Sequence, residues 1–97
     1  MKLSETPLNS AVITSTYVTQ DRMPILYVSY GDDGEGGAIW QFHCGNNDYD
    51  MEKMQLVSLK TILSYDADII NIPDVPINYC AKRDTVSTVW RVEEDRN

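Results

Sequence analysis

The sequence has few of the residues from which reactive sites are built. It contains one histidine and two cysteines among 97 residues, whereas a structural zinc site takes four ligands and a small secreted scaffold relies on several disulfides. It also lacks an apolar run approaching the ~18 residues of a membrane span. These absences weigh against a metal centre, a disulfide-stabilised scaffold and a membrane protein, and we predict no cofactor.

Positive charge is also scarce. Lysine and arginine together number 8 against 15 acidic residues, which leaves a formal net charge of -7. Such a chain repels phosphate backbones, so we expect no nucleic-acid partner, but it would steer a basic protein toward itself. Negative charge also keeps a small protein soluble, and composition does not separate these two roles. The first ten residues lack the apolar core of a signal peptide, which predicts a cytoplasmic protein with reduced thiols.

The remaining composition is that of one globular domain spanning residues 1–97, with a loose N-terminus at 1–9. Apolar residues make up 42% of the chain. Leucines and isoleucines spaced by three and four residues within 51–66 indicate a helix. We predict an α+β fold in which one principal helix packs on a mainly antiparallel sheet of about five strands. The predicted strands are 10–20, 25–31, 38–44, 77–83 and 87–94, with a loop at 31–37 and a short strand or extended segment at 68–72.

The single histidine and one cysteine are adjacent, at His43 and Cys44, at the end of a predicted strand. Side chains alternate between the faces of a strand, so Cys44 shares one face with Trp40 and Phe42, and His43 shares the other with Gln41. A nucleophilic pair needs both side chains within hydrogen-bond reach. Regular alternation separates them, although a bulge just after the pair would bring them closer. The pattern favours a buried cysteine over a catalytic pair.

Acidic residues cluster on both sides of the predicted strand 38–44, and no basic residue occurs from 31 to 52. The stretch after Gly45 lacks the central glycine and terminal glutamate of a calcium-binding loop. The loop at 31–37 lacks the lysine of a phosphate-binding loop. We therefore interpret these acids as a surface that binds a basic partner. They are Asp32, Asp33, Glu35, Asp48, Asp50 and Glu52.

Two stretches carry a resemblance to a known family. "WQFHCGNNDYD" (40–50) joins an aromatic strand to an acidic loop, and "LVSLKTILSYDADIINIPDVPINYCAKRD" (56–84) leads from a helix through YD-x-DII and a D-x-P turn to a closing R-D. Over about residues 11–93 the chain resembles immunity-protein family number thirty-three of bacterial polymorphic toxin systems. The matching residues are Trp40, Phe42, Gly45, Asp48, Tyr65, Asp66, Asp68, Ile69, Ile70, Asp74, Pro76, Arg83 and Asp84.

This resemblance implies a non-enzymatic protein that binds and neutralises a cognate bacterial toxin domain. Many toxin domains are basic, which suits an acidic partner. Two alternatives stay open. In one, the segment 65–76 lines a small-molecule pocket of a regulatory domain. In the other, the protein is an enzyme that uses His43, Cys44 and Asp66. The family-motif residues to which we assign no role are Trp40, Tyr65, Asp66, Asp68, Asp74 and Pro76.

Overall fold

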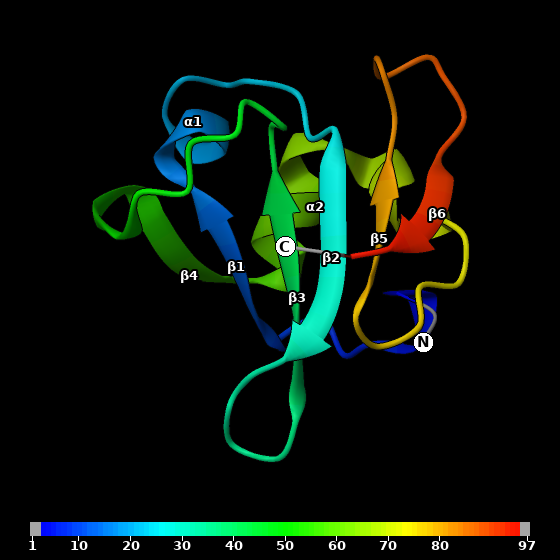
Figure 1. Cartoon of the computed structure of the whole chain (residues 1–97). Helices are drawn as coiled ribbons and strands as arrows, with labels where there is room; N and C mark the ends of the chain where they lie inside the picture. Colours follow the sequence, from blue (N-terminus) through cyan, green and yellow to red (C-terminus); the bar gives the residue numbers. More distant parts are fainter. Residues whose placement is uncertain (1–2, 96–97) are drawn as a thin grey trace.

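The computed structural model describes residues 3–95, which contain one six-stranded sheet in the order β4-β1-β3-β2-β5-β6 (Figure 1). Neighbouring strands are antiparallel except β1 and β3, which are parallel. The strands are β1 (Ala11–Ser15), β2 (Tyr27–Asp32), β3 (Ala38–His43), β4 (Met54–Ser58), β5 (Tyr79–Lys82) and β6 (Arg91–Glu94). The α-helices are α1 (Thr16–Thr19) and α2 (Leu59–Tyr65), and the 3-10 helices are η1 (Leu3–Glu5), η2 (Met51–Lys53) and η3 (Ala67–Asn71). The predicted α+β fold is confirmed.

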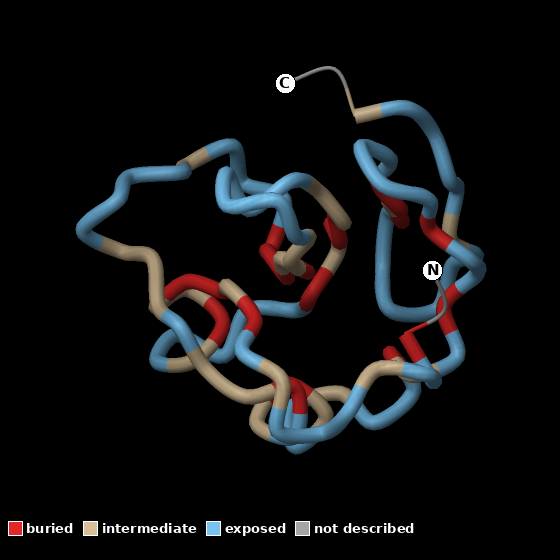
Figure 2. The backbone as a smooth tube through the Cα atoms, turned by 90° about the horizontal axis from the view of Figure 1, so that it is seen from below, coloured by how far each residue is buried: buried red, intermediate tan, exposed pale blue. Residues whose placement is uncertain are grey.

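The core lies between the sheet and α2, which packs behind β2 and β3 in the view of Figure 1. Seen from below, the buried segments lie inside a rim of exposed loops (Figure 2). Burial of this apolar surface is the main stabilising contribution in a domain of this size. The buried cluster contains Leu3, Val12, Val18, Ile25, Val28, Trp40, Phe42, Cys44, Leu59, Ile62, Ile69, Ile72, Val75 and Ala81.

The helix predicted at 51–66 is wrong over its first half. Residues Met54–Ser58 form β4 at the edge of the sheet, and Leu56, expected on the apolar helix face, is 67% exposed. Apolar spacing over so few residues fits a strand as well as a helix, and hydrogen bonding to β1 favours the strand. The helix begins immediately after Ser58, whose Oγ accepts a hydrogen bond from the Thr61 amide at 3.2 Å.

Two further predictions need correction. The strand predicted at 10–20 ends at Ser15, and α1 follows it with Val18 turned into the core. The segment 68–72 is neither a strand nor extended, because most of it lies in η3. Asp66 caps this 3-10 helix by accepting a hydrogen bond from the Asp68 amide at 3.2 Å. Capping by an aspartate competes with extended structure, which explains the difference.

The loose N-terminus predicted at 1–9 does not describe residues 3–9. Leu3 is fully buried in the core, and the Lys60 amide donates to the Leu8 carbonyl at 2.9 Å. Burial of this leucine, worth about 2 kcal/mol, acts together with the backbone hydrogen bonds of the segment to hold it against the core. Residues 1 and 2 lie outside the described range.

Candidate functional site

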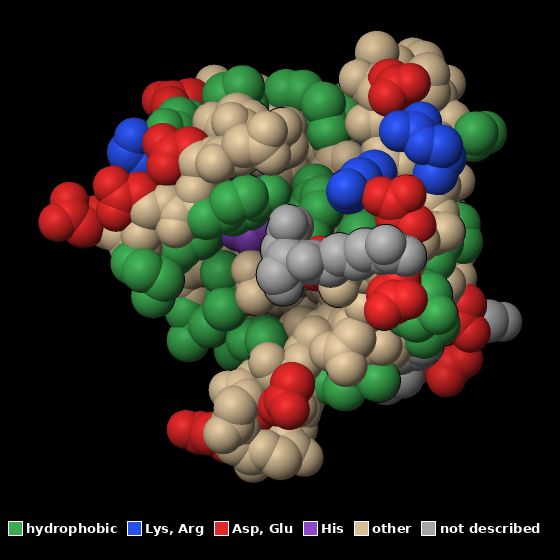
Figure 3. Space-filling model, viewed as in Figure 1, with side chains coloured by type: hydrophobic (Ala, Val, Ile, Leu, Met, Phe, Trp, Pro, Cys, Tyr) green, Lys and Arg blue, Asp and Glu red, His purple; other side chains and the backbone are tan. Residues whose placement is uncertain are grey.

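The structure places the six acidic residues in two loops at opposite ends of β3, so they do not form one patch (Figure 1). Asp32, Asp33 and Glu35 lie at or within the turn that joins β2 to β3, at the bottom of the view. The other three lie in or next to the connection from β3 to β4, which we call the 45–53 loop. In Figure 3 acidic side chains are visible to the left and below, and others lie on the right-hand side of the molecule. The two loops are therefore separate candidate surfaces.

The 31–37 loop uses two of its carboxylates to hold its own backbone. Asp32 Oδ1 accepts a hydrogen bond from the Gly34 amide at 2.8 Å, and Asp33 Oδ1 accepts from the amides of Glu35 and Gly37 at 2.8 and 3.0 Å. Such turns satisfy amides that strand pairing leaves open. The loop exposes charge and glycine but no large apolar side chain.

The 45–53 loop is tied to α1 through Tyr17. The Tyr17 hydroxyl donates to Asp48 Oδ2, and Lys53 Nζ lies 2.7 Å from the Tyr17 oxygen and 3.2 Å from Asp48 Oδ2. The hydrogen bond from Tyr17, with those from the Asp50 amide and Lys53, lowers the pKa of Asp48 below its usual value. The pKa of Lys53 is raised, chiefly by Tyr17 and then by Asp48. Asp48 is thus part of a structural contact, which the sequence did not indicate.

The rest of this loop combines negative charge with exposed apolar surface. Asp50 and Glu52 are exposed and form no ion pair with a cation among residues 3–95. Between and beside them, Met51 is 82% exposed and Tyr49 is 42% exposed. Asp50 also caps η2 by accepting from the Glu52 amide at 3.1 Å. The loop therefore offers both charge and apolar anchors to a partner.

The structure separates His43 from Cys44 as predicted. Cys44 is a free thiol in the core, whereas His43 points to the other face, with Nε2 3.0 Å from Gln41 Oε1. No hydrogen bond joins the two side chains in the described part of the chain. Tyr49 folds over the imidazole edge-on, with ring centroids 5.1 Å apart, and buries it. Burial lowers the pKa of His43 to about 4. The pair has no nucleophile–base geometry.

Among the family-motif residues, Asp66 forms an ion pair with Arg83. Its Oδ2 lies 2.8 Å from Arg83 Nη2, and the Arg83 side chain is only 5% exposed. Arg83 also donates to the Ile25 carbonyl from Nε at 3.1 Å and from Nη2 at 2.8 Å, and its guanidinium lies 4.2 Å from the centre of the Trp90 ring. Arg83 thus links its own segment, at the end of β5, to the segments that contain Ile25, Asp66 and Trp90. The pairing was missed, although both residues belong to the family match and carry opposite charge.

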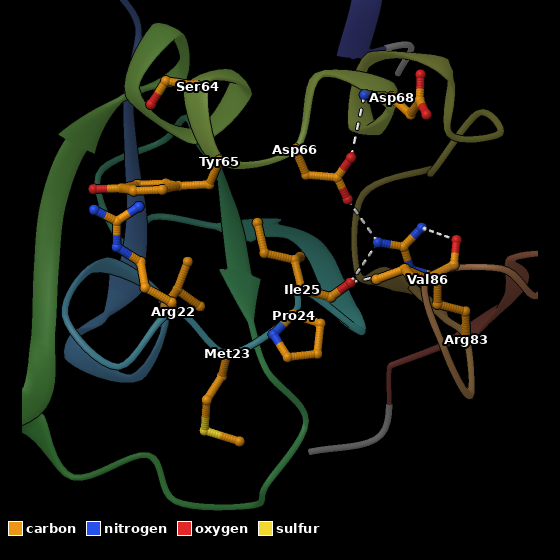
Figure 4. A pocket seen from close by; sticks show the side chains of 11 residues that line it. Arg22, Met23, Pro24, Ile25, Ser64, Tyr65, Asp66, Asp68, Arg83 and Val86 are labelled. Atoms are coloured by element: carbon orange, nitrogen blue, oxygen red, sulfur yellow. Dashed lines mark hydrogen bonds and ion pairs between the residues drawn. The ribbon is translucent and has the colours of Figure 1, made fainter.

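Beside this ion pair lies a cavity of about 500 Å³. In Figure 4, Arg22 lies against the face of Tyr65, with its guanidinium carbon 5.5 Å from the ring centre, and the Asp66–Arg83 pair lies on the other side. No carboxylate pairs with Arg22 in the described residues. The cavity is lined by Val18, Arg22, Met23, Pro24, Ile25, Ser64, Tyr65, Asp66, Asp68, Arg83 and Val86.

The remaining motif residues lie apart from one another. Trp40 is buried in the core, next to Tyr30 at a centroid distance of 4.6 Å. Asp68 is exposed at the cavity, whereas Asp74 and Pro76 are exposed on the turn before β5. The structure brings together Tyr65, Asp66 and Asp68 but not the other three.

Residues 3–95 contain neither a cluster of metal-ligating side chains nor a helix that could span a membrane. No three histidine, cysteine or acidic side chains in this range are grouped so as to hold a metal ion. None of its helices has the length and apolar character needed to cross a membrane. Comparison of the chain with protein-family models, curated proteins and solved structures finds no match.

Proposed function

We propose that this protein is a non-enzymatic immunity protein that binds and neutralises a cognate bacterial toxin domain through the 45–53 loop. The observation that carries the proposal is the composition of this loop, in which exposed Met51 and Tyr49 alternate with Asp48, Asp50 and Glu52. Protein interfaces draw most of their energy from a few large side chains and their association rate from charge. The resemblance of the chain to an immunity family supplies the class of partner.

The 31–37 loop is the less favourable docking surface. It carries three acids, Asp32, Asp33 and Glu35, but four of its seven residues are glycine and it has no apolar anchor. It can contribute long-range attraction to a basic protein without contributing contact energy. Replacing a glutamate by lysine should therefore weaken toxin binding more in the 45–53 loop than in the 31–37 loop.

The test compares matched charge reversals in the two loops. Glu52→Lys and Glu35→Lys change the net charge equally, and both residues are exposed. Binding to the product of the neighbouring gene is measured by calorimetry. We expect Glu52→Lys and Met51→Ala each to raise Kd by about tenfold or more, and Glu35→Lys to raise it by less than about threefold.

Rescue of cells that express the neighbouring gene product provides the functional readout. The wild-type protein should restore growth, and the Met51→Ala variant should restore it less well at equal expression. A neighbouring product that is not toxic, or toxicity that the protein does not relieve, would refute the proposed function. Equal effects of Glu52→Lys and Glu35→Lys on Kd would instead refute the proposal that the 45–53 loop is the binding surface.

A second candidate function is small-molecule binding in the 500 Å³ cavity. The observation that favours it is Arg22, a cation at the cavity wall without a carboxylate partner in residues 3–95, stacked on Tyr65. An anionic ligand with a flat ring would suit this pair. A thermal-shift screen with nucleotides and sugars tests it, with Arg22→Ala as control. Uniformly absent shifts, or shifts that persist in the Arg22 variant, count against the cavity.

A further inference from the structure

The two edges of the sheet are protected to different degrees. The sheet ends in β6 on one side and in β4 on the other (Figure 1). Three of the four residues of β6 are charged, which discourages pairing with another strand. β4, with the sequence MQLVS, has no charge and no proline, and its central Leu56 is 67% exposed. An uncharged, exposed edge strand is the kind that pairs with another chain.

The hydrogen-bonding groups that β4 leaves open can be identified from its pairing with β1. The Leu59 amide donates to the Ser10 carbonyl at 3.0 Å. Hydrogen bonding alternates along an antiparallel pair, so Gln55 and Val57 face β1, and the N–H and C=O groups of the intervening residues point outward. The outward residues are Met54, Leu56 and Ser58.

Two of these six outward groups are already used. The Met54 amide donates to the Met51 carbonyl of η2. The Ser58 carbonyl accepts the first hydrogen bond of α2, because Ser58 is the N-cap of that helix. Among residues 3–95, the groups left without a hydrogen-bond partner are the Met54 carbonyl, both groups of Leu56 and the Ser58 amide.

These four groups are complementary to the same four groups on a second copy. When β4 pairs antiparallel with β4 of another copy and Leu56 faces Leu56, the two leucines exchange both hydrogen bonds. Each Met54 carbonyl then meets the Ser58 amide of the other copy. All four open groups of each strand find a partner in this register. Shifting the register by two residues in either direction leaves half of them unpaired.

Charge at the two ends of β4 supports the same pairing. Exposed Glu52 lies two residues before the strand, and exposed Lys60 lies two residues after it. An antiparallel arrangement brings the Glu52 end of each copy toward the Lys60 end of the other. It also places the exposed Leu56 side chains side by side on one face of the joint sheet, where they bury each other.

We propose that this protein forms a twofold homodimer by antiparallel pairing of β4 with β4, centred on Leu56, which gives one continuous sheet. The occupant of this edge is a second copy of the chain because the open groups, the exposed leucine and the terminal charges are self-complementary. This proposal does not rest on toxin binding and goes beyond it.

Sedimentation of the full chain from about 10 µM to about 1 mM, the range in which weak homodimers form, tests the proposal. We expect the dimer fraction to rise with concentration. Leu56→Lys places two lysines opposite each other and should raise the dimer Kd at least about tenfold. The matched control is Val92→Lys at an outward position of β6, which should leave Kd unchanged. Both residues are exposed, so neither change should prevent folding.

Mixing provides a direct test of the register. Leu56→Lys and Leu56→Glu variants should each remain monomeric when alone and should form a heterodimer when mixed, because the introduced charges then attract. Hydrogen exchange should show concentration-dependent protection at the Leu56 and Ser58 amides. A chain that is monomeric at about 1 mM overturns the proposal, even when another protein binds this edge. A dimer insensitive to Leu56→Lys also overturns it.

Discussion

Arg83 is the residue whose replacement we expect to destabilise the fold most clearly. Its guanidinium donates to the Ile25 carbonyl and to Asp66, and it stacks on Trp90. The Arg83 side chain is 5% exposed and that of Asp66 is 24% exposed, so truncation removes the guanidinium donors of the Ile25 carbonyl and the cation that faces Asp66 Oδ2, where water has limited access. We expect Arg83→Ala to lower the free energy of unfolding by about 3–5 kcal/mol.

This magnitude follows from the number and kind of contacts. Hydrogen bonds that involve a charged group contribute about 1.5–3 kcal/mol each. Stacking of a cation on a tryptophan adds about 0.5–1 kcal/mol. Partial rehydration of the exposed part of Asp66 returns some of the loss. The expected change is a large fraction of the roughly 5–10 kcal/mol that stabilises a domain of this length.

Arg91→Ala is the matched control. Arg91 also pairs with an aspartate, Asp84, at 3.2 Å, but their side chains are 55% and 73% exposed. An exposed pair of this kind is worth about 0–0.5 kcal/mol, because water and salt screen it. Arg83→Ala and Arg91→Ala should therefore differ by several kcal/mol in the free energy of unfolding, although both remove an arginine that pairs with an aspartate.

Urea unfolding followed by tryptophan fluorescence measures the free energy of unfolding of both variants. Arg83→Lys provides a second point, since it keeps the charge but cannot reproduce the planar set of donors, and we expect about 1.5–3 kcal/mol of destabilisation. That variant remains informative even when Arg83→Ala does not fold. A loss for Arg83→Ala no larger than that for Arg91→Ala would contradict the reasoning.

Three further outcomes can be checked by similar means. The pKa of His43 falls from 6.5 to about 4 on folding, so below pH 6.5 the unfolded chain binds a proton that the folded chain does not. Lowering the pH from 8 to 5 should therefore reduce the free energy of unfolding by about 2 kcal/mol. Urea titrations at the two pH values should show that this reduction is absent in His43→Gln. Gly45 has φ of +78°, so Gly45→Ala should cost about 1 kcal/mol in urea unfolding, whereas Gly31→Ala, at an ordinary φ with open space around it, should cost nothing measurable. Cys44 and Cys80 are buried, and burial raises the pKa of the Cys80 thiol, so both should react with a thiol reagent far more slowly in the folded protein than in urea; rapid labelling of either would contradict its burial.

Several parts of the fold could be predicted from the chain alone because their signals are local. Alternation placed Trp40 and Phe42 on the buried face of β3, together with Cys44 just after the strand, and the glycine-rich loop after β2 indicated the hairpin. The helix–strand choice at 54–58 was different. Its apolar spacing fits both structures, and only the presence of β1 beside it selects the strand.

The candidate site shows the same division. The sequence alone indicated that acids surround one strand and that aspartates follow α2. The interpretation of these acids as one binding surface was wrong, because the length of β3 holds the two acidic loops apart at its opposite ends. The sequence also did not indicate the contact of Tyr17 with Asp48, which spans 31 residues. Contacts of that separation have no periodic signal.

Residue type and short-range spacing are enough to specify the composition on which the chemistry of this chain depends: few cations, one histidine, two cysteines and a modest set of apolar residues. Its folding specifies the partners of those residues. The burial of His43 under Tyr49, the insertion of Arg83 between Ile25 and Asp66, and the exposure of Leu56 on an open edge all depend on segments distant in sequence. Hydrogen bonding and burial act between neighbours in space, and long-range sheet pairing determines which residues become neighbours.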